Sequence, residues 1–154
     1  MRNRSFVIAL YLMLARISGP LFRLAQKRRL NRGKEDPLRQ NEQWGRAHHM
    51  RPTKGRLVWF HAASIGETQS ILGIAEQLLA QDEQLHVLIT SVTVSSAKLL
   101  EHSTHDRLMH QFAPYDCYRP VCRFLDHWRP DLAIWVESEL WPQDRKSTRL
   151  NSSH

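Results

Sequence analysis

Cysteine is scarce in this sequence, with two residues among 154. Cys117 and Cys122 are separated by four residues, which is the spacing of neither a zinc site nor a thioredoxin-like redox motif. A single disulfide would also be unusual for a domain of this size in a reducing compartment. We therefore interpret both cysteines as ordinary helix residues, not as a metal site or a covalent staple.

The glycine-rich and nucleophile motifs of several large enzyme classes are missing as well. The sequence contains no GxxxxGK[ST] phosphate loop, no GxGxxG after its first predicted strand and no GxSxG turn. Its nine histidines are scattered without metal-ligand spacing. We interpret His61, at the end of a predicted strand, as an interior histidine with a hydrogen-bond partner, and His48 and His49 as solvent-exposed. The sequence thus predicts no metal ion and no bound cofactor.

The chain also lacks an apolar run long enough for a clear membrane span. Residues 6–15 (FVIALYLMLA) are ten consecutive apolar residues, whereas a transmembrane helix needs about 20. Arg16 ends the run, Gly19-Pro20 is expected to break the helix, and a basic cluster follows at positions 27–34. For residues 1–34 we favour an amphipathic anchor helix on a membrane surface over a single span or a signal peptide.

Charge is divided unevenly along the chain, although the net charge is +7. Residues 1–56 hold 14 Lys/Arg and three acidic residues, whereas residues 57–143 hold five Lys/Arg and 11 acidic residues. A nucleic-acid-binding domain is expected to carry the basic face itself, so this division argues against nucleic acid as a partner. A cationic leader on an acidic domain instead fits an anionic membrane leaflet.

Short apolar runs alternate with helical patterns in residues 57–143. We predict strands at 57–62, 85–90, 110–112 and 132–136, and helices at 68–80, 95–101 and 118–128, with Ser95 as the N-cap of the second helix. The strands are apolar throughout, as expected when helices cover both faces of a parallel sheet. The sequence therefore predicts an α/β domain with a parallel sheet and helices on both of its faces. Residues 35–56 are predicted to be a polar linker with a short helix near 38–44. One interpretation of the linker's charged side chains is that they are solvated.

Two polar segments follow predicted strands at the carboxyl edge of this sheet, where open α/β folds bind ligands. In the first, Ser64-Ile65-Gly66-Glu67-Thr68, the glycine turn would let a ligand approach the backbone. Glu67 is either functional or a first-turn acid that interacts with the helix dipole. In the second segment, Glu137 is either a desolvated functional carboxylate or a strand-end acid bonded to a loop. Glu139 is either solvent-facing or bonded to loop amides.

Residues 144–154 (DRKSTRLNSSH) show no hydrophobic periodicity. They resemble the translation of a common sequencing adapter, and scars of this kind are left out of fold reasoning. We therefore expect this tail to be artefactual and the biological sequence to end near Gln143.

Two motifs carry a family resemblance. WFHAASIGET (59–68) resembles the [WL]-x-H-x-[AV]-S-[VI]-G-E-[TF] signature of bacterial 3-deoxy-D-manno-octulosonic acid (Kdo) transferases, and VESELWP (136–142) is similar to their x-E-[TS]-E-L-W-P signature. Between them, residues 89–93 and 111–116 are similar to shorter family elements. On these motifs the chain is identified as the N-terminal part of such a transferase. It departs from the family at residues 94–97, where many relatives have a glycine-containing turn.

The resemblance implies a GT-B glycosyltransferase, with two Rossmann-like domains that face a cleft, of which residues 57–143 form the acceptor-side one. It implies inverting, metal-independent transfer of Kdo from CMP-Kdo to a lipid A precursor (lipid IVA) at the cytoplasmic face of the inner membrane. CMP-Kdo would be bound by a C-terminal domain that this sequence lacks. The fragment is therefore expected to be inactive alone.

Site roles also follow from the resemblance. Glu67 matches the general base of the family, which removes a proton from the acceptor sugar. Glu137 matches a carboxylate that stabilises the transition state, and Glu139 a supporting position. Ser64 and Gly66 match the loop that shapes the acceptor pocket.

Other protein classes stay open at the level of the sequence. The main alternative is a membrane-tethered, non-catalytic α/β module that binds a lipid or sugar phosphate and needs neither carboxylate. A receiver-like signalling domain is disfavoured, because its first strand would end in acidic residues, where this strand ends His61-Ala62-Ala63-Ser64. A different GT-B glycosyltransferase is disfavoured by the Glu-Leu-Trp-Pro motif.

Overall fold

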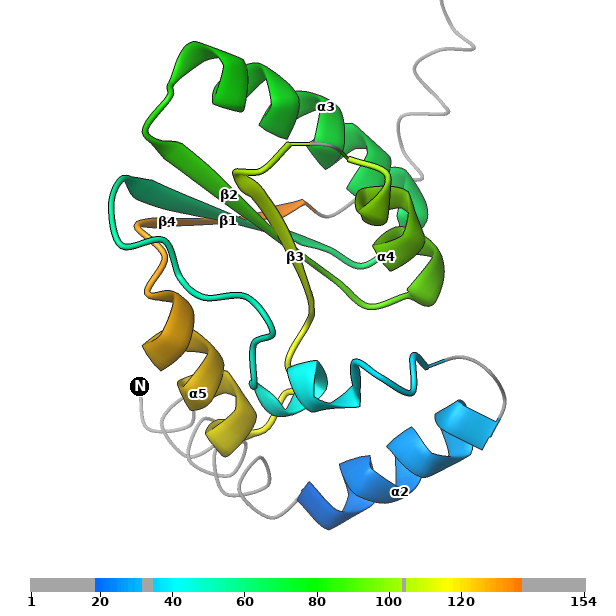
Figure 1. Cartoon of the computed structure of the whole chain (residues 1–154). Helices are drawn as coiled ribbons and strands as arrows, with labels where there is room; N and C mark the ends of the chain where they lie inside the picture. Colours follow the sequence, from blue (N-terminus) through cyan, green and yellow to red (C-terminus); the bar gives the residue numbers. More distant parts are fainter. Residues whose placement is uncertain (1–18, 32–34, 104, 137–154) are drawn as a thin grey trace, which may run out of the picture.

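The computed structural model describes residues 19–31, 35–103 and 105–136 (Figure 1). In chain order, its elements are α2 (Gly19–Asn31), the 3-10 helix η1 (Gln40–Trp44), β1 (Arg56–Ala62), α3 (Ile65–Gln81), β2 (Leu85–Ser91), α4 (Val94–Glu101), β3 (Leu108–Phe112), α5 (Tyr118–Trp128) and β4 (Leu132–Val136). Strands and helices alternate from β1 onward. The predicted α/β class and each strand and helix predicted between residues 57 and 136 are therefore confirmed.

The four described strands form one parallel sheet in the order β3-β2-β1-β4. Helices α3 and α4 cover one face of this sheet, and α5 covers the other (Figure 1). The chain moves outward from β1 through β2 to β3, and then crosses back to place β4 on the other side of β1. The direction of winding therefore reverses between β1 and β4, the kind of position at which open α/β sheets bind ligands.

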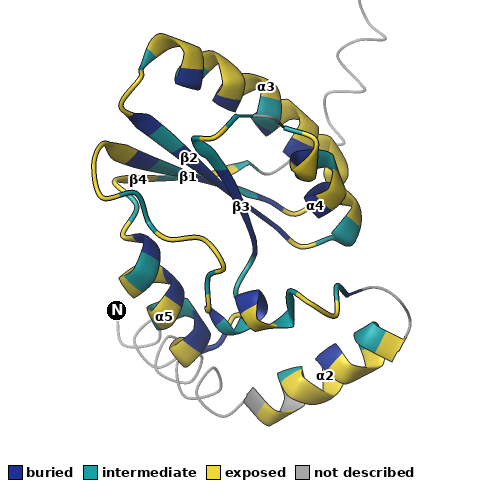
Figure 2. Cartoon of the chain, in the orientation of Figure 1, coloured by how far each residue is buried: buried dark blue, intermediate teal, exposed yellow. Residues whose placement is uncertain are grey.

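Alternate residues of the central strands contribute to two apolar clusters (Figure 2). Under α3 and α4 lie Phe60, Ala62, Ile71, Ala75, Leu79, Leu85, Val87, Ile89 and Leu100, and under α5 lie Leu57, Trp59, Leu88, Met109, Phe124 and Trp128. Because successive side chains point to opposite faces, β1 and β2 contribute apolar residues to both clusters. The edge strand β4 differs, since Leu132 and Trp135 are 53% and 56% exposed.

Element boundaries differ from the predictions at a few positions. Helix α3 begins at Ile65, three residues earlier than predicted, because Ser64 caps it. The N-cap of α4 is Thr93 and not Ser95, since Thr93 Oγ1 accepts the Ser96 N–H at 3.1 Å. Helix α2 begins at Gly19-Pro20, and the break expected before it involves residues outside the described ranges and stays a prediction. Proline suits a first turn, where its missing N–H has no partner to lose.

The polar segment of residues 35–56 packs against the domain. Glu42 is 1% exposed, and its carboxylate accepts Arg39 Nε at 2.8 Å and the Phe112 backbone N–H at 2.7 Å. Arg39 Nη2 also lies 2.8 Å from His110 Nδ1, and His110 Nε2 lies 2.9 Å from Ser91 Oγ. The solvated interpretation of this segment's charges therefore does not hold for Glu42, which is buried and bonded to Arg39 of its own segment and to Phe112 of β3.

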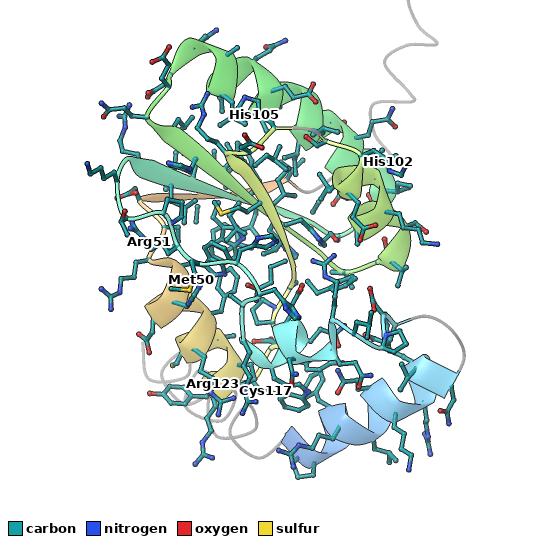
Figure 3. All side chains as sticks on the ribbon, viewed as in Figure 1. Met50, Arg51, His102, His105, Cys117 and Arg123 are labelled. Carbon is teal, nitrogen blue, oxygen red and sulfur yellow. The ribbon has the colours of Figure 1, made fainter. Side chains whose placement is uncertain are left out.

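The same segment is hydrogen-bonded to α2 on one side and to α5 of the domain on the other. Trp44 Nε1 donates to Gln26 Oε1 of α2 at 2.9 Å, and Arg123 Nη1 of α5 donates to the Trp44 carbonyl oxygen at 3.3 Å. Arg51 Nε donates to the Trp128 carbonyl oxygen at 2.6 Å, so the chain runs alongside α5 before it enters β1 (Figure 3). Helix α2 is thus attached to the domain through side-chain hydrogen bonds.

Among the described helices, none is long and apolar enough to cross a membrane. The apolar run of residues 6–15 lies outside the described ranges, so the anchor helix stays a prediction. Within α2, Arg23, Lys27 and Arg28 are exposed.

Replacing Glu42 with Ala should cost about 2–3 kcal/mol of folding free energy, because the Phe112 N–H would lose its acceptor and Arg39 would keep only the exposed Glu101 as an acidic partner. The exposed Glu83 provides the matched control, and Glu83→Ala should change stability by less than about 0.5 kcal/mol. Urea unfolding of the two variants measures the difference. Equal midpoints would show that the buried pair does not hold the polar segment in place.

His110 should make stability depend on pH. Burial, and to a smaller extent the charge of Arg39, lowers the pKa of His110 from 6.5 to about 3. Between these values the unfolded chain binds a proton that the folded chain does not. The contribution of His110 is therefore complete above its unfolded pKa and is lost as the pH falls toward its folded pKa, by up to about 1.4 kcal/mol per pH unit.

Urea unfolding between about pH 7 and pH 4 tests this dependence. His110→Gln should flatten the loss of stability, because the variant has no group to titrate there. A variant with the same pH dependence as the wild type would contradict the assignment.

Candidate functional site

The turn between β1 and α3 is closed by reciprocal hydrogen bonds. Ser64 has an extended backbone conformation, with φ −128° and ψ 163°, and its Oγ accepts the Glu67 N–H at 3.2 Å. In return, Glu67 Oε2 accepts the N–H of Ala63 at 2.7 Å and that of Ser64 at 3.3 Å. This is the capping box that a Ser-x-x-Glu spacing produces at a helix N-terminus. It holds the Glu67 carboxylate at the carboxyl end of β1.

Thr68 anchors this turn to the core. Its side chain is fully buried, and its Oγ1 donates to the Ser64 carbonyl oxygen at 2.8 Å. Because Ser64 in turn caps Glu67, the position of the carboxylate is coupled to the packing under α3. The turn is therefore part of the packed domain.

Two features of the turn act on the Glu67 carboxylate. The backbone N–H groups of Ala63 and Ser64 donate to it. The positive end of the α3 dipole lies beside the same group. The geometry thus shows that Glu67 is a first-turn acid of α3, as one of the two alternatives had it, and adds a capping-box role that the sequence analysis did not consider.

Gly66 is required by neither the backbone nor the packing. It lies in the first turn of α3, and a Cβ at this position would meet no atom of the described residues within 4 Å. The sequence places this glycine in a strand-to-helix turn, whereas the structure places it within the first turn of α3, where it is exposed. That a ligand approaches the backbone here stays a prediction.

The carboxyl ends of the strands are aligned around this turn. Ala62, the last residue of β1, is in register with Ser91 at the end of β2 and with Val136 at the end of β4. Glu137 directly follows Val136 in the sequence, but Glu137 and Glu139 both lie outside the described residues. In the described parts of the chain, no group of three or more His, Cys, Asp or Glu side chains is placed to hold a metal ion.

His61 has a more specific setting than its sequence position indicated. It is half-buried at the end of β1, and its Nδ1 lies 2.9 Å from Thr90 Oγ1 on the neighbouring strand. Trp59 Nε1 donates to the same hydroxyl oxygen at 2.8 Å. The pairing of His61 with Thr90 depends on the register of β1 against β2, which the sequence alone does not specify.

Together, a parallel α/β sheet and a capped carboxylate at its switch point define a Rossmann-like domain with a candidate ligand site at the carboxyl edge. Comparison with known proteins gives the family. Residues 38–151 match the model of the family described as 3-deoxy-D-manno-octulosonic-acid transferase (kdotransferase).

Curated relatives agree with the family model. The chain is 36% identical over 137 residues to a probable mitochondrial 3-deoxy-D-manno-octulosonic acid transferase of Arabidopsis thaliana, covering 89% of this chain and 30% of the relative. It is 35% identical over 136 residues to a 3-deoxy-D-manno-octulosonic acid transferase of Rickettsia bellii, covering 88% of this chain and 32% of the relative. A 3-deoxy-D-manno-octulosonic acid transferase of Rickettsia typhi is 43% identical over 86 residues, covering 56% of this chain and 19% of the relative.

This chain therefore belongs to the 3-deoxy-D-manno-octulosonic acid transferase family of glycosyltransferases. It spans 30% and 32% of the length of the plant protein and the Rickettsia bellii protein. No solved structure matches the chain.

Gly66→Ala should stabilise the domain by about 0.5–1 kcal/mol, because alanine has the higher helix propensity and its methyl group meets no neighbour among the described residues. Gly73 is the matched control, since it lies in the same helix and a Cβ there also meets no atom of the described part of the chain within 4 Å. Gly73→Ala should therefore stabilise by a similar amount in thermal or urea unfolding. A loss of stability for Gly66→Ala alone would show that the fold itself requires this glycine.

Proposed function

We propose that this chain is the acceptor-side domain of a GT-B enzyme that transfers Kdo from CMP-Kdo to a lipid A precursor, lipid IVA, in lipopolysaccharide synthesis. The observation that carries the proposal is the Glu67 carboxylate, held by two backbone N–H groups at the switch point of the sheet. Family membership supports the same reaction. The donor would be bound by a second domain, in the part of a full-length relative that this chain does not span.

In the proposed reaction, Glu67 is the general base. Its ionised carboxylate takes the proton of an acceptor sugar hydroxyl as that oxygen attacks the anomeric carbon of Kdo. The new bond joins the acceptor oxygen to the anomeric carbon. The bond from that carbon to the CMP phosphate breaks, and CMP leaves with the electron pair. A single displacement inverts the anomeric configuration, and no metal ion takes part in the proposed step.

The remaining site residues have supporting roles in this proposal. Glu137 would stabilise positive charge that develops on the Kdo ring, and Glu139 would support it. Their place in the sequence, directly after the strand that pairs with β1, favours this assignment. Ser64 holds Glu67 through the capping box, and Gly66 leaves room for the acceptor.

The membrane is the proposed location of the acceptor. Residues 1–34 would lie on the cytoplasmic face of the inner membrane, and the exposed basic residues Arg23, Lys27 and Arg28 of α2 would face its anionic headgroups. Side-chain hydrogen bonds from Gln26 of α2 to Gln43 and Trp44 attach the helix to the domain. This attachment supports a fixed orientation of the proposed catalytic site toward the membrane surface.

Glu67→Gln in the full-length enzyme tests the base directly. Glutamine is accepted at this capping-box position, so the fold should be kept, but it does not take up a proton. Kdo transfer should fall by about 10²-fold or more. Glu76→Gln removes the same charge from an exposed position on the same helix and should leave both transfer and stability unchanged.

The outcome separates the two roles of Glu67. A Glu67→Gln enzyme with wild-type transfer would leave Glu67 as a helix cap only, as the non-catalytic module requires.

The variants Gly66→Ala and Gly73→Ala provide a second test, which separates acceptor binding from fold stability. Gly66→Ala should raise the KM for the acceptor, whereas Gly73→Ala should not, although both are expected to stabilise the fold.

A further inference from the structure

Helices α2 and α5 lie on the same side of the molecule, away from α3 and α4 (Figure 1). Both helices expose cationic side chains to solvent, which are Arg23, Lys27 and Arg28 on α2 and Arg119 and Arg123 on α5. The last two are separated by one helical turn and therefore share one face of α5. Neither belongs to the apolar clusters of the sheet or to the proposed catalytic group.

Trp44 of η1 brings the cations of the two helices together. The Arg23 guanidinium lies over its ring, 5.4 Å from the centroid, and Arg123 Nη1 donates to its carbonyl oxygen at 3.3 Å. The next residue, Gly45, has φ +78°, and a Cβ there would lie 2.2 Å from the Pro120 carbonyl oxygen and 3.0 Å from the Arg123 Cβ. The turn after η1 therefore lies directly against α5, in a place that has no room for a Cβ.

Buried hydrogen bonds fix α2 in this place. Gln26 Nε2 donates to Gln43 Oε1 at 2.9 Å, and the same oxygen accepts the Tyr115 hydroxyl at 2.6 Å. Gln43 Nε2 donates to Glu35 Oε2 at 2.6 Å, and Glu35 Oε1 accepts Arg29 Nε of α2 at 2.6 Å. Since Tyr115 belongs to the turn that leads into α5, this network gives the two helices a defined position relative to each other.

The surface formed by α2 and α5 concentrates positive charge beside a domain that is otherwise acidic. Residues 57–143 hold five Lys/Arg against 11 acidic residues, and Arg119 and Arg123 are two of the five. Helix α2 contains no acidic residue, and the exposed acids of α5 and of the turn before it are Asp126 and Asp116. The surface therefore keeps an excess of positive charge, which is complementary to an anionic partner.

An apolar side chain among the cations indicates that this partner is a lipid surface. Leu24 lies between cationic residues of α2 and is 50% exposed. The apolar run of residues 6–15 also precedes α2 in the sequence. Cationic helices that expose apolar residues suit the boundary between anionic headgroups and acyl chains. These features favour an anionic bilayer over an acidic protein or a nucleic acid.

We propose that the face of α5 with Arg119 and Arg123 is the second half of a docking surface for anionic lipid headgroups, of which α2 is the first half. The inference rests on the membrane location in the proposed function, which involves α2 but not α5. Contact through one helix leaves the domain free to rotate about that helix, whereas contact through two helices fixes its orientation. Because α5 follows the carboxyl end of β3, docking through α5 turns the edge of the sheet that carries Glu67 toward the lipid.

Sedimentation of the full-length enzyme with vesicles of phosphatidylcholine and phosphatidylglycerol tests this surface. Arg119→Gln/Arg123→Gln should weaken binding by roughly 10- to 25-fold, because each cation near an anionic bilayer contributes about fivefold. Lys54→Gln/Lys98→Gln is the matched control, since it removes the same charge from exposed positions before β1 and on α4. This control should bind like the wild type, and so should Arg119→Lys/Arg123→Lys, which keeps both charges. Vesicles of phosphatidylcholine alone should not distinguish the four proteins.

Kdo transfer separates this inference from the proposed function. With lipid IVA in nonionic detergent micelles, all four proteins should transfer Kdo equally, because no substituted residue belongs to the proposed catalytic group. With lipid IVA in the anionic vesicles, only Arg119→Gln/Arg123→Gln should be slower.

Two results would overturn the docking surface. One is wild-type binding of Arg119→Gln/Arg123→Gln to the anionic vesicles, and the other is an equal loss of binding by the Lys54→Gln/Lys98→Gln control, which would mean that only net charge matters. In both cases transfer in micelles leaves the proposed function standing. If the wild type transfers no Kdo in micelles, the proposed function is wrong, and vesicle binding alone decides the docking surface.

Discussion

The capping box between Ser64 and Glu67 is the interaction on which the proposed site depends. It ends β1, begins α3 and holds a carboxylate at the point where the winding of the sheet reverses. Thr68 connects this turn to the core through the Ser64 carbonyl oxygen. The same four hydrogen bonds thus serve the fold and place the proposed base, so a variant that only removes Glu67 tests two roles at once. Glutamine at this position is informative because it separates them.

A second constraint comes from the polar segment before β1. Arg39, Glu42 and His110 form a buried hydrogen-bonded group that joins the start of the chain to β3. Charges taken out of water are stable only when they are paired and fully bonded. This requirement makes the segment part of the domain. It also attaches α2, with its exposed basic residues, in a defined place relative to the sheet.

Much of this architecture could be predicted from the sequence, because apolar runs and helical spacing are local signals. These signals predict the order of strands and helices and the acid at the start of α3. The sequence favours Ser95 as the N-cap of α4, although Thr93 takes the role, since both residue types suit a cap and only the backbone conformation selects between them. The burial of Glu42 and the pairing of His61 with Thr90 depend on contacts between distant segments, which no local pattern records.

The central claim is that Glu67 takes a proton during transfer. Chemical rescue tests it most directly, since an added small carboxylate replaces a missing base but does not rebuild a helix cap. In the full-length Glu67→Ala enzyme, Kdo transfer to lipid IVA should be nearly lost and should recover with increasing formate, but not with the same concentrations of chloride. A Glu67→Ala enzyme that transfers Kdo at the wild-type rate without formate would contradict the account.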